Sequence, residues 1–200
     1  MQHLPTYIQN LPIAISDVVD SSEQQIITDK LNHEKLNQII GKESLQQKIT
    51  EEMDQSKQAN KKFTILFLNF DRYWDSICHF HGSTEHKNSD EAVNIIARRL
   101  QQCTRECDLI CRCDNNEFIF LLPEICNENE INTIVQMIYH HLREPLFIHN
   151  RKQPEVTSSI GISVYPDNGN NTNILLQNAC LAMRQAKKDG GNTHCYYTGD

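Results

Sequence analysis

The chain has 200 residues, of which 38% are hydrophobic and 22% are charged, and its formal net charge is −7. This length suits one globular domain with a short appendage and is thin for two domains. The acidic balance, without a long run of Lys or Arg, argues against nucleic acid or an anionic membrane as the main partner. Since no export signal or bilayer-length apolar stretch is visible, we expect a cytoplasmic protein without a membrane span.

The eight cysteines are predicted to be reduced thiols, because nothing in the sequence marks the chain for an oxidising compartment. Four of them lie close together in sequence without forming a CxxC pair: Cys103, Cys107, Cys111 and Cys113. The segment 78–86, with one Cys and three His, reads better as a solvated loop than as a set of metal ligands. We therefore expect no zinc site.

The first half of the chain predicts an N-terminal arm, followed by a helix, a strand and a second helix. Residues 1–33 are expected to be an arm or connector, with Ser22 capping a short helix, and residues 34–200 to be the main domain. Residues 42–62 show the spacing of an amphipathic helix, and the apolar run Phe63–Phe70 is typical of a buried central strand. After a polar loop, Ser89 is expected to cap a helix that runs to Cys103.

The second half predicts a hairpin, two helices and two strands. Residues 108–113 and 117–123 read as strands around a tight Asp-Asn-Asn turn, whose residues tolerate positive φ. Residues 128–142 then predict a helix, residues 155–166 a strand, residues 173–191 a helix closed by Gly190, and residues 193–198 a last strand. This order indicates an α/β sandwich with helices on a mainly antiparallel sheet, whose chemistry would lie at one end of the strands.

Four segments carry a family likeness: FTILFLNFDRY (63–73), RRLQQCTRECDLICRCDNNEFIFLLP (98–123), VTSSIGISVYPDNG (156–169) and ACLAMRQAKKDGGN (179–192). Together they resemble a GGDEF domain, the catalytic domain of bacterial diguanylate cyclases, from about Glu34 to Tyr197. The resemblance implies a palm-like nucleotidyl-cyclase fold, with a central mainly antiparallel sheet flanked by helices, and a role in cyclic di-GMP signalling.

The same resemblance implies that the metal site has been lost. The family's enzymes act as dimers and use carboxylates to hold two Mg²⁺ ions beside GTP. The positions of two of these acids resemble Asn69 and Asn116, and of the signature itself only Glu117 and Phe118 remain. A unit charge pair about 4 Å apart is worth on the order of 4 kcal/mol at an effective dielectric of about 20. We therefore expect no bound Mg²⁺ and no catalytic residue.

Most of the family's substrate contacts also look replaced. The positions that differ from the pattern resemble Trp74, Ile77, Asp114, Asn115, Cys180, Arg184 and Gly191. Asp90 and Lys187 persist as candidate nucleotide contacts, although the loop before Asp90 is about four residues longer than the family's pattern. So many changes at one end of the sheet indicate that the domain no longer catalyses the conversion of GTP.

One ligand motif matches the family in letters and spacing. Arg105 and Asp108 stand where the family has its RxxD inhibitory site for cyclic di-GMP, five residues before the signature. A guanidinium can grip phosphate or a guanine edge, and a carboxylate can accept from guanine N–H groups. The alternative is that Arg105 is a cation near a helix C-terminus and Asp108 begins a strand, with no ligand.

Three hypotheses for function stay open. The first is an inactive regulatory module that senses cyclic di-GMP or controls a protein partner. The second is a nucleotide-free interaction module, acting through a homodimer or through the phosphodiesterase domain that often follows in the family, which would make this chain a piece of a longer protein. The third is a residual diguanylate cyclase that uses Glu117, Asp71 and Asp90.

Overall fold

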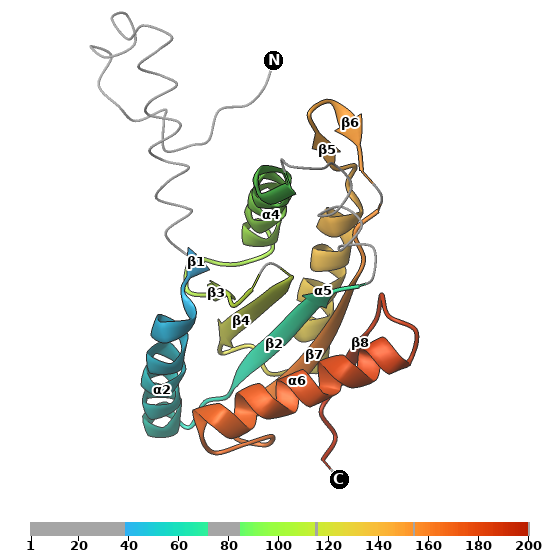
Figure 1. Cartoon of the computed structure of the whole chain (residues 1–200). Helices are drawn as coiled ribbons and strands as arrows, with labels where there is room; N and C mark the ends of the chain where they lie inside the picture. The colour runs from blue at the N-terminus through green and yellow to red at the C-terminus, as the bar shows by residue number, and fades with distance from the viewer. Residues whose placement is uncertain (1–38, 72–84, 115, 154, 200) are drawn as a thin grey trace, which may run out of the picture. The chain divides into compact units, whose positions relative to one another are not determined.

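The computed structural model describes residues 39–71, 85–114, 116–153 and 155–199, without the side chains of residues 42, 43 and 85–90 (Figure 1). The expected N-terminal arm lies outside the described residues. So do Trp74, Ile77 and most of the Cys and His segment at 78–86. The predicted division of the chain near residue 33 therefore stays a prediction.

A six-stranded sheet forms the centre of the fold (Figure 1). Its strands, in spatial order, are β1 (Ile39–Ile40), β3 (Leu109–Arg112), β4 (Glu117–Pro123), β2 (Phe63–Phe70), β7 (Ser158–Tyr165) and β8 (His194–Tyr196). The four inner strands pair antiparallel, whereas β1 and β8 each run parallel to their neighbour. The prediction of a mainly antiparallel sheet is therefore confirmed, and every residue of β2 is buried, as its apolar run predicts.

Helices cover both faces of this sheet (Figure 1). The helices α2 (Lys42–Ala59) and α6 (Thr172–Lys188) pack on one face, and α4 (Glu85–Gln101) and α5 (Glu128–Arg143) pack on the other. A small second sheet of β5 (Phe147–Ile148) and β6 (Arg151–Lys152) follows α5. Neither this hairpin nor β1 was expected, because two-residue strands are too short to leave a period in the sequence.

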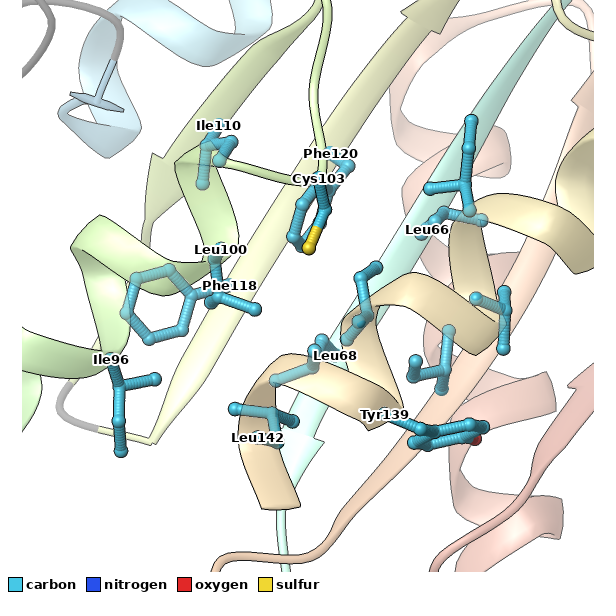
Figure 2. Close-up of a cluster of buried hydrophobic side chains, with 14 of the residues drawn as sticks. Leu66, Leu68, Ile96, Leu100, Cys103, Ile110, Phe118, Phe120, Tyr139 and Leu142 are labelled. Atoms are coloured by element: carbon cyan, nitrogen blue, oxygen red, sulfur yellow. The ribbon is translucent and has the colours of Figure 1, made fainter. Parts of the chain in front are cut away.

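The larger core lies between the sheet and the pair α4 and α5 (Figure 2). Figure 2 shows Phe118 of β4 beside Leu100 of α4, and the same cluster includes Phe120 of β4, Ile96 of α4 and Leu142 of α5. All five side chains are at most 2% exposed. Burial of apolar surface contributes about 25 cal/mol per Å² to stability. This core therefore holds the sheet against α4 and α5, and with it the strand ends that carry the site described below.

One helix boundary differs from expectation. Ser89 was expected to be the N-cap of the second predicted helix, but α4 begins at Glu85, so Ser89 lies inside the helix. An N-cap preference is worth only about 1 kcal/mol, and the preceding residues are compatible with a helix, so the local signal is overridden. Part of the long polar loop is thus helical, and the predicted end near Cys103 falls at Gln101.

The contact between α6 and β7 depends on Gly161. A Cβ atom built on this residue would stand 2.0 Å from the carbonyl oxygen of Ala179 and 2.1 Å from the backbone nitrogen of Met183. No side chain fits there, so the helix backbone lies directly on the strand. This close approach positions the last turn of α6 against the end of the sheet.

The side of β7 that faces away from β2 is hydrogen-bonded by a strand, β8, and also by one side chain. β8 pairs with residues Ile160–Ile162 only. Beyond it, the backbone N–H of Val164 donates to Oδ1 of Asn168 at 2.8 Å, and the backbone N–H of Asn168 donates to the Val164 carbonyl at 2.7 Å. Asn168 Nδ2 also donates to the Tyr197 carbonyl at 3.2 Å. Asn168 therefore acts as one residue of an added strand.

Candidate functional site

Three polar residues form a row across the end of the sheet. Asn69, at the end of β2, pairs directly with Glu117 of β4 on one side and with Ser159 of β7 on the other. Directly opposed residues of antiparallel strands point to the same face. This face is the one covered by α2 and α6, whose core neighbours in β2 are Phe63, Ile65 and Phe67.

The Asn69 amide is held in one orientation by charged groups on both sides. The residue is 6% exposed. Its Nδ2 donates to Oε1 of Glu117 at 2.9 Å, and its Oδ1 accepts from Nζ of Lys187 at 2.5 Å. The same ammonium donates to the carbonyl oxygen of Phe70 at 3.1 Å. The result is a chain of complementary bonds from Lys187 through Asn69 to Glu117.

This arrangement does not fit the divalent metal that the family resemblance implies. Magnesium prefers oxygen ligands that carry negative charge. Here the Asn69 oxygen is neutral and accepts from an ammonium, and one oxygen of the remaining acid, Glu117, accepts from the Asn69 amide. A metal ion would have to displace Lys187 or lie beside a like charge.

Asp71 has a structural role next to this row. Its Oδ1 accepts from the Ser159 hydroxyl at 2.7 Å, and its Oδ2 accepts from the backbone N–H of Asn192 at 2.9 Å. Gly191, at φ +75°, lies against the same carboxylate, since an added Cβ would stand 3.1 Å from it. Asp71 thus fixes the turn that leads from α6 into β8. Among the hypotheses drawn from the sequence, only that of a residual cyclase assigns a role to Asp71.

The signature hairpin is also tied to the end of β2. The backbone N–H groups of Cys113 and Asp114 donate to the Glu117 carbonyl at 3.0 and 3.4 Å, which closes the predicted turn. The carbonyl of Asn116 accepts from the Phe70 N–H at 3.0 Å. The two asparagines at the family's acid positions, Asn69 and Asn116, are therefore near one another in the fold, as the resemblance implies.

The two persisting nucleotide candidates have different outcomes. Lys187 reaches the site, but its ammonium is bound to β2. Asp90 lies in α4, and its side chain is not among those that the structure describes. Within the described ranges, no group of three or more His, Cys, Asp and Glu side chains is arranged to hold a metal ion. None of the helices in these ranges is both long and apolar enough to span a membrane.

Arg105 and Asp108 are brought together, but they bind each other. The Asp108 side chain is 0% exposed, while that of Arg105 is 48% exposed. Asp108 Oδ1 accepts from Nη2 of Arg105 at 2.7 Å, and Oδ2 accepts from its backbone N–H at 2.8 Å. The guanidinium also donates to the Pro123 carbonyl at 2.7 Å. The carboxylate beside it raises the pKa of Arg105.

This pairing changes what the RxxD motif offers to a ligand. A guanine base could reach the exposed edge of the guanidinium, but Asp108 has no exposed oxygen to accept from it. Asp108 lies just before β3 and its N–H donates to the Arg105 carbonyl at 3.1 Å, so the pair also closes a turn between α4 and the hairpin. The reading in which the two residues need no ligand accounts for all of these contacts.

Comparisons with known proteins agree with the fold. A family model described as "Diguanylate cyclase, GGDEF domain" matches residues 31–193. The GGDEF domain of TpbB (YfiN) from Pseudomonas aeruginosa has 22% sequence identity and a TM-score of 0.73, with 81% of this chain and 98% of that chain covered. The diguanylate cyclase SiaD, solved with its activator SiaC from the same organism, has 20% identity and a TM-score of 0.71, with 88% and 68% covered.

A curated relative places the match within a longer protein. "Cyclic di-GMP phosphodiesterase NbdA" of Pseudomonas aeruginosa is 25% identical over 146 residues, which are 73% of this chain. The match spans only 18% of that relative's length. The activity in its name therefore belongs to a protein of which this chain matches one part.

Proposed function

Because the chain belongs to the GGDEF family of diguanylate cyclase domains, we propose that it is a catalytically inactive member that acts as a cytoplasmic regulatory module in cyclic di-GMP signalling. The observation that carries this proposal is the bond between Asn69 and Glu117. Glu117, the surviving acid of the signature, accepts a hydrogen bond from the neutral amide of Asn69. Two-metal chemistry needs a second carboxylate at the position of that amide.

Turnover of GTP is the direct test of inactivity. The purified chain is incubated with GTP and either Mg²⁺ or Mn²⁺, and the products are separated by chromatography. No cyclic di-GMP is expected above the level of a heat-denatured sample. Product formed at a rate that Glu117→Gln or Asn116→Ala abolishes, while Lys188→Ala leaves it unchanged, would overturn the proposal.

The residual-cyclase hypothesis receives little support from the geometry. Two of its three acids already have structural partners, Glu117 with Asn69 and Asp71 with Ser159 and Asn192. These bonds orient the two carboxylates toward protein donors, and each hydrogen bond to a carboxylate that a metal ion displaced would cost about 1.5–3 kcal/mol. The same turnover experiment with Mn²⁺ decides this hypothesis.

A second candidate function is recognition of cyclic di-GMP through Arg105. The half-exposed guanidinium favours it, whereas the buried Asp108 limits the ligand to contacts with the arginine. Calorimetric titration with cyclic di-GMP is the test, repeated on Arg105→Ala and on Arg105→Lys. Binding that both variants lose would support a receptor that depends on the planar guanidinium. An absence of binding to the wild type would leave regulation through protein contacts.

A protein partner is the other way in which an inactive domain can act. The name of NbdA suggests a phosphodiesterase domain as that partner, in the same chain or as a separate protein. Ile174 and Leu181 of α6 are 39% and 44% exposed and lie two helical turns apart on one side of the helix, where they offer two apolar contacts for such a partner or for a homodimer. A concentration-dependent dimer in ultracentrifugation that Leu181→Lys abolishes would favour the homodimer.

A further inference from the structure

We propose that the ammonium group of Lys187 is a built-in cation that takes the place of the divalent metal ion at the end of β2. This inference rests on the proposed loss of catalysis and names the group that replaces the metal. It concerns the chain Lys187–Asn69–Glu117, which we call the lysine clasp. Its consequence is a domain that is assembled without any metal ion.

The atoms that bind the ammonium are those that a hard cation would use. Lys187 Nζ donates to an amide oxygen, Oδ1 of Asn69, and to a backbone carbonyl, that of Phe70. Neutral carbonyl oxygens, of amides and of the backbone, are ligands for hard divalent cations in proteins when carboxylates complete the site. A lysine ammonium is a compact charge with three donors, so it can occupy such a position. The ammonium and a metal ion therefore compete for the same two oxygens.

The charges within the clasp balance. An aspartate at position 69 would place a second carboxylate within hydrogen-bond distance of Glu117, where the two would repel unless a doubly charged ion lay between them. Asparagine leaves a single carboxylate, and one ammonium neutralises it. The Asn69 amide also supplies a donor to Glu117 and an acceptor to Lys187, which an aspartate could not do.

The fold delivers Lys187 to this position. The residue lies in the last turn of α6, where a cation is favoured by the helix dipole. The helix backbone reaches the end of β2 because Gly161 lets it lie directly on β7. Lys187 and Lys188 are both exposed residues, but Lys188 is not part of the clasp, so it serves as a matched control.

Manganese binding tests the proposal without relying on activity. MnCl₂ is titrated calorimetrically into the wild type, Asn69→Asp, Lys187→Met, and the double variant Asn69→Asp/Lys187→Met. We expect no saturable binding by the wild type. The double variant, with two carboxylates and no ammonium, is expected to bind Mn²⁺ at least about tenfold more tightly than Asn69→Asp alone. Adding Lys188→Met to Asn69→Asp should not produce this gain.

Two results would overturn the inference. One is saturable binding of Mn²⁺ by the wild type that Glu117→Gln removes. The other is equal affinity of Asn69→Asp and the double variant, because the ammonium would then present no obstacle to the metal. Neither result depends on turnover. GTP turnover by the wild type would instead overturn the proposed function, so the two failures are distinguishable.

A measurement on the unmodified chain covers the case in which a variant fails to fold. The native protein is labelled briefly with an amine-reactive succinimidyl ester, and the extent at each lysine is read by mass spectrometry. Lys187 is expected to react several-fold more slowly than Lys188, because its nitrogen is engaged in the clasp. Equal labelling of the two neighbours would contradict the proposal.

Discussion

Both carboxylate oxygens of Asp108 accept hydrogen bonds from Arg105, three residues earlier in the chain. The Asp108 side chain is fully buried, so Arg105 is the group that compensates its charge. A buried charge that loses its partner is strongly destabilising, even where the pair itself adds little net stability. Removing Arg105 from the RxxD motif should therefore destabilise the fold, whether or not the motif binds a ligand.

We predict that Arg105→Ala lowers the free energy of unfolding by about 1–3 kcal/mol, because the buried Asp108 loses the guanidinium and keeps only the backbone N–H of residue 105 from this partner. The double variant Arg105→Ala/Asp108→Asn should recover part of this loss, with a coupling energy of about 1–3 kcal/mol. Urea unfolding of the four proteins in the cycle measures both quantities. Additive losses would show that the two residues do not interact as described.

Gly161→Ala should destabilise the domain by at least about 3 kcal/mol, or prevent folding, because the methyl group would overlap the backbone of α6. Gly190→Ala provides the comparison. That residue has a positive φ of 118° but open space around it, so strain alone should cost about 1–2 kcal/mol. Chemical denaturation of both variants tests the difference. A similar loss in the two would mean that α6 can move away from β7 at little cost.

The thiols should differ sharply in reactivity. Burial raises the pKa of Cys103 to about 12, so almost none of it is thiolate near neutral pH. Cys126 is exposed. Treatment of the native protein with iodoacetamide, followed by peptide mass spectrometry, should find Cys126 modified early and Cys103 protected until urea unfolds the chain. Early modification of Cys103 in native buffer would contradict its burial beneath α4.

The free energy of unfolding should decrease as the pH is lowered, in part because of His194. Burial lowers the pKa of this imidazole, whereas a histidine in the unfolded chain has a pKa of about 6.5. Below that value the unfolded chain takes up a proton that the folded chain resists, so the contribution is intact at higher pH and is lost as pH falls through the 6.5 region. His194→Phe preserves an aromatic ring beside Tyr139 and Tyr196.

The measurement is the free energy of unfolding of the wild type and His194→Phe at several pH values from about 7.5 downward. The free energy of unfolding of the wild type should fall more steeply than that of the variant as the pH is lowered. A parallel decline in the two proteins would assign the pH dependence to other groups.

Long elements with a clear period could be predicted from the sequence, and short ones could not. The buried strand Phe63–Phe70 and the helix Glu128–Arg143 follow their apolar patterns closely. The strands β1, β5 and β6 have two residues each and exist because neighbouring elements present a partner, which no local pattern records. The early start of α4 has a similar cause, since a capping preference is weaker than the helix that continues past it.

The site could be predicted only as a set of positions. The family likeness assigned Asn69, Asn116 and Glu117 to one end of the sheet, and the strand register brings Asn69 beside Glu117. What each polar atom binds was not predictable. The resemblance made Lys187 a candidate nucleotide contact, whereas its ammonium binds Asn69, 118 positions away in the sequence. Ser159 and Asn192 showed no signal, because a serine in a strand and an asparagine in a turn are common for many reasons.

The bonds that Asn168 makes to Val164 have a consequence for self-association. An uncovered strand edge is a template on which another chain can add a strand, and this is a common route to aggregation. On β7 that route is closed by β8 for part of the strand and by one asparagine beyond it. The outermost strands of the sheet are then β1 and β8, with two and three residues, and edges this short give an incoming strand little backbone to pair with.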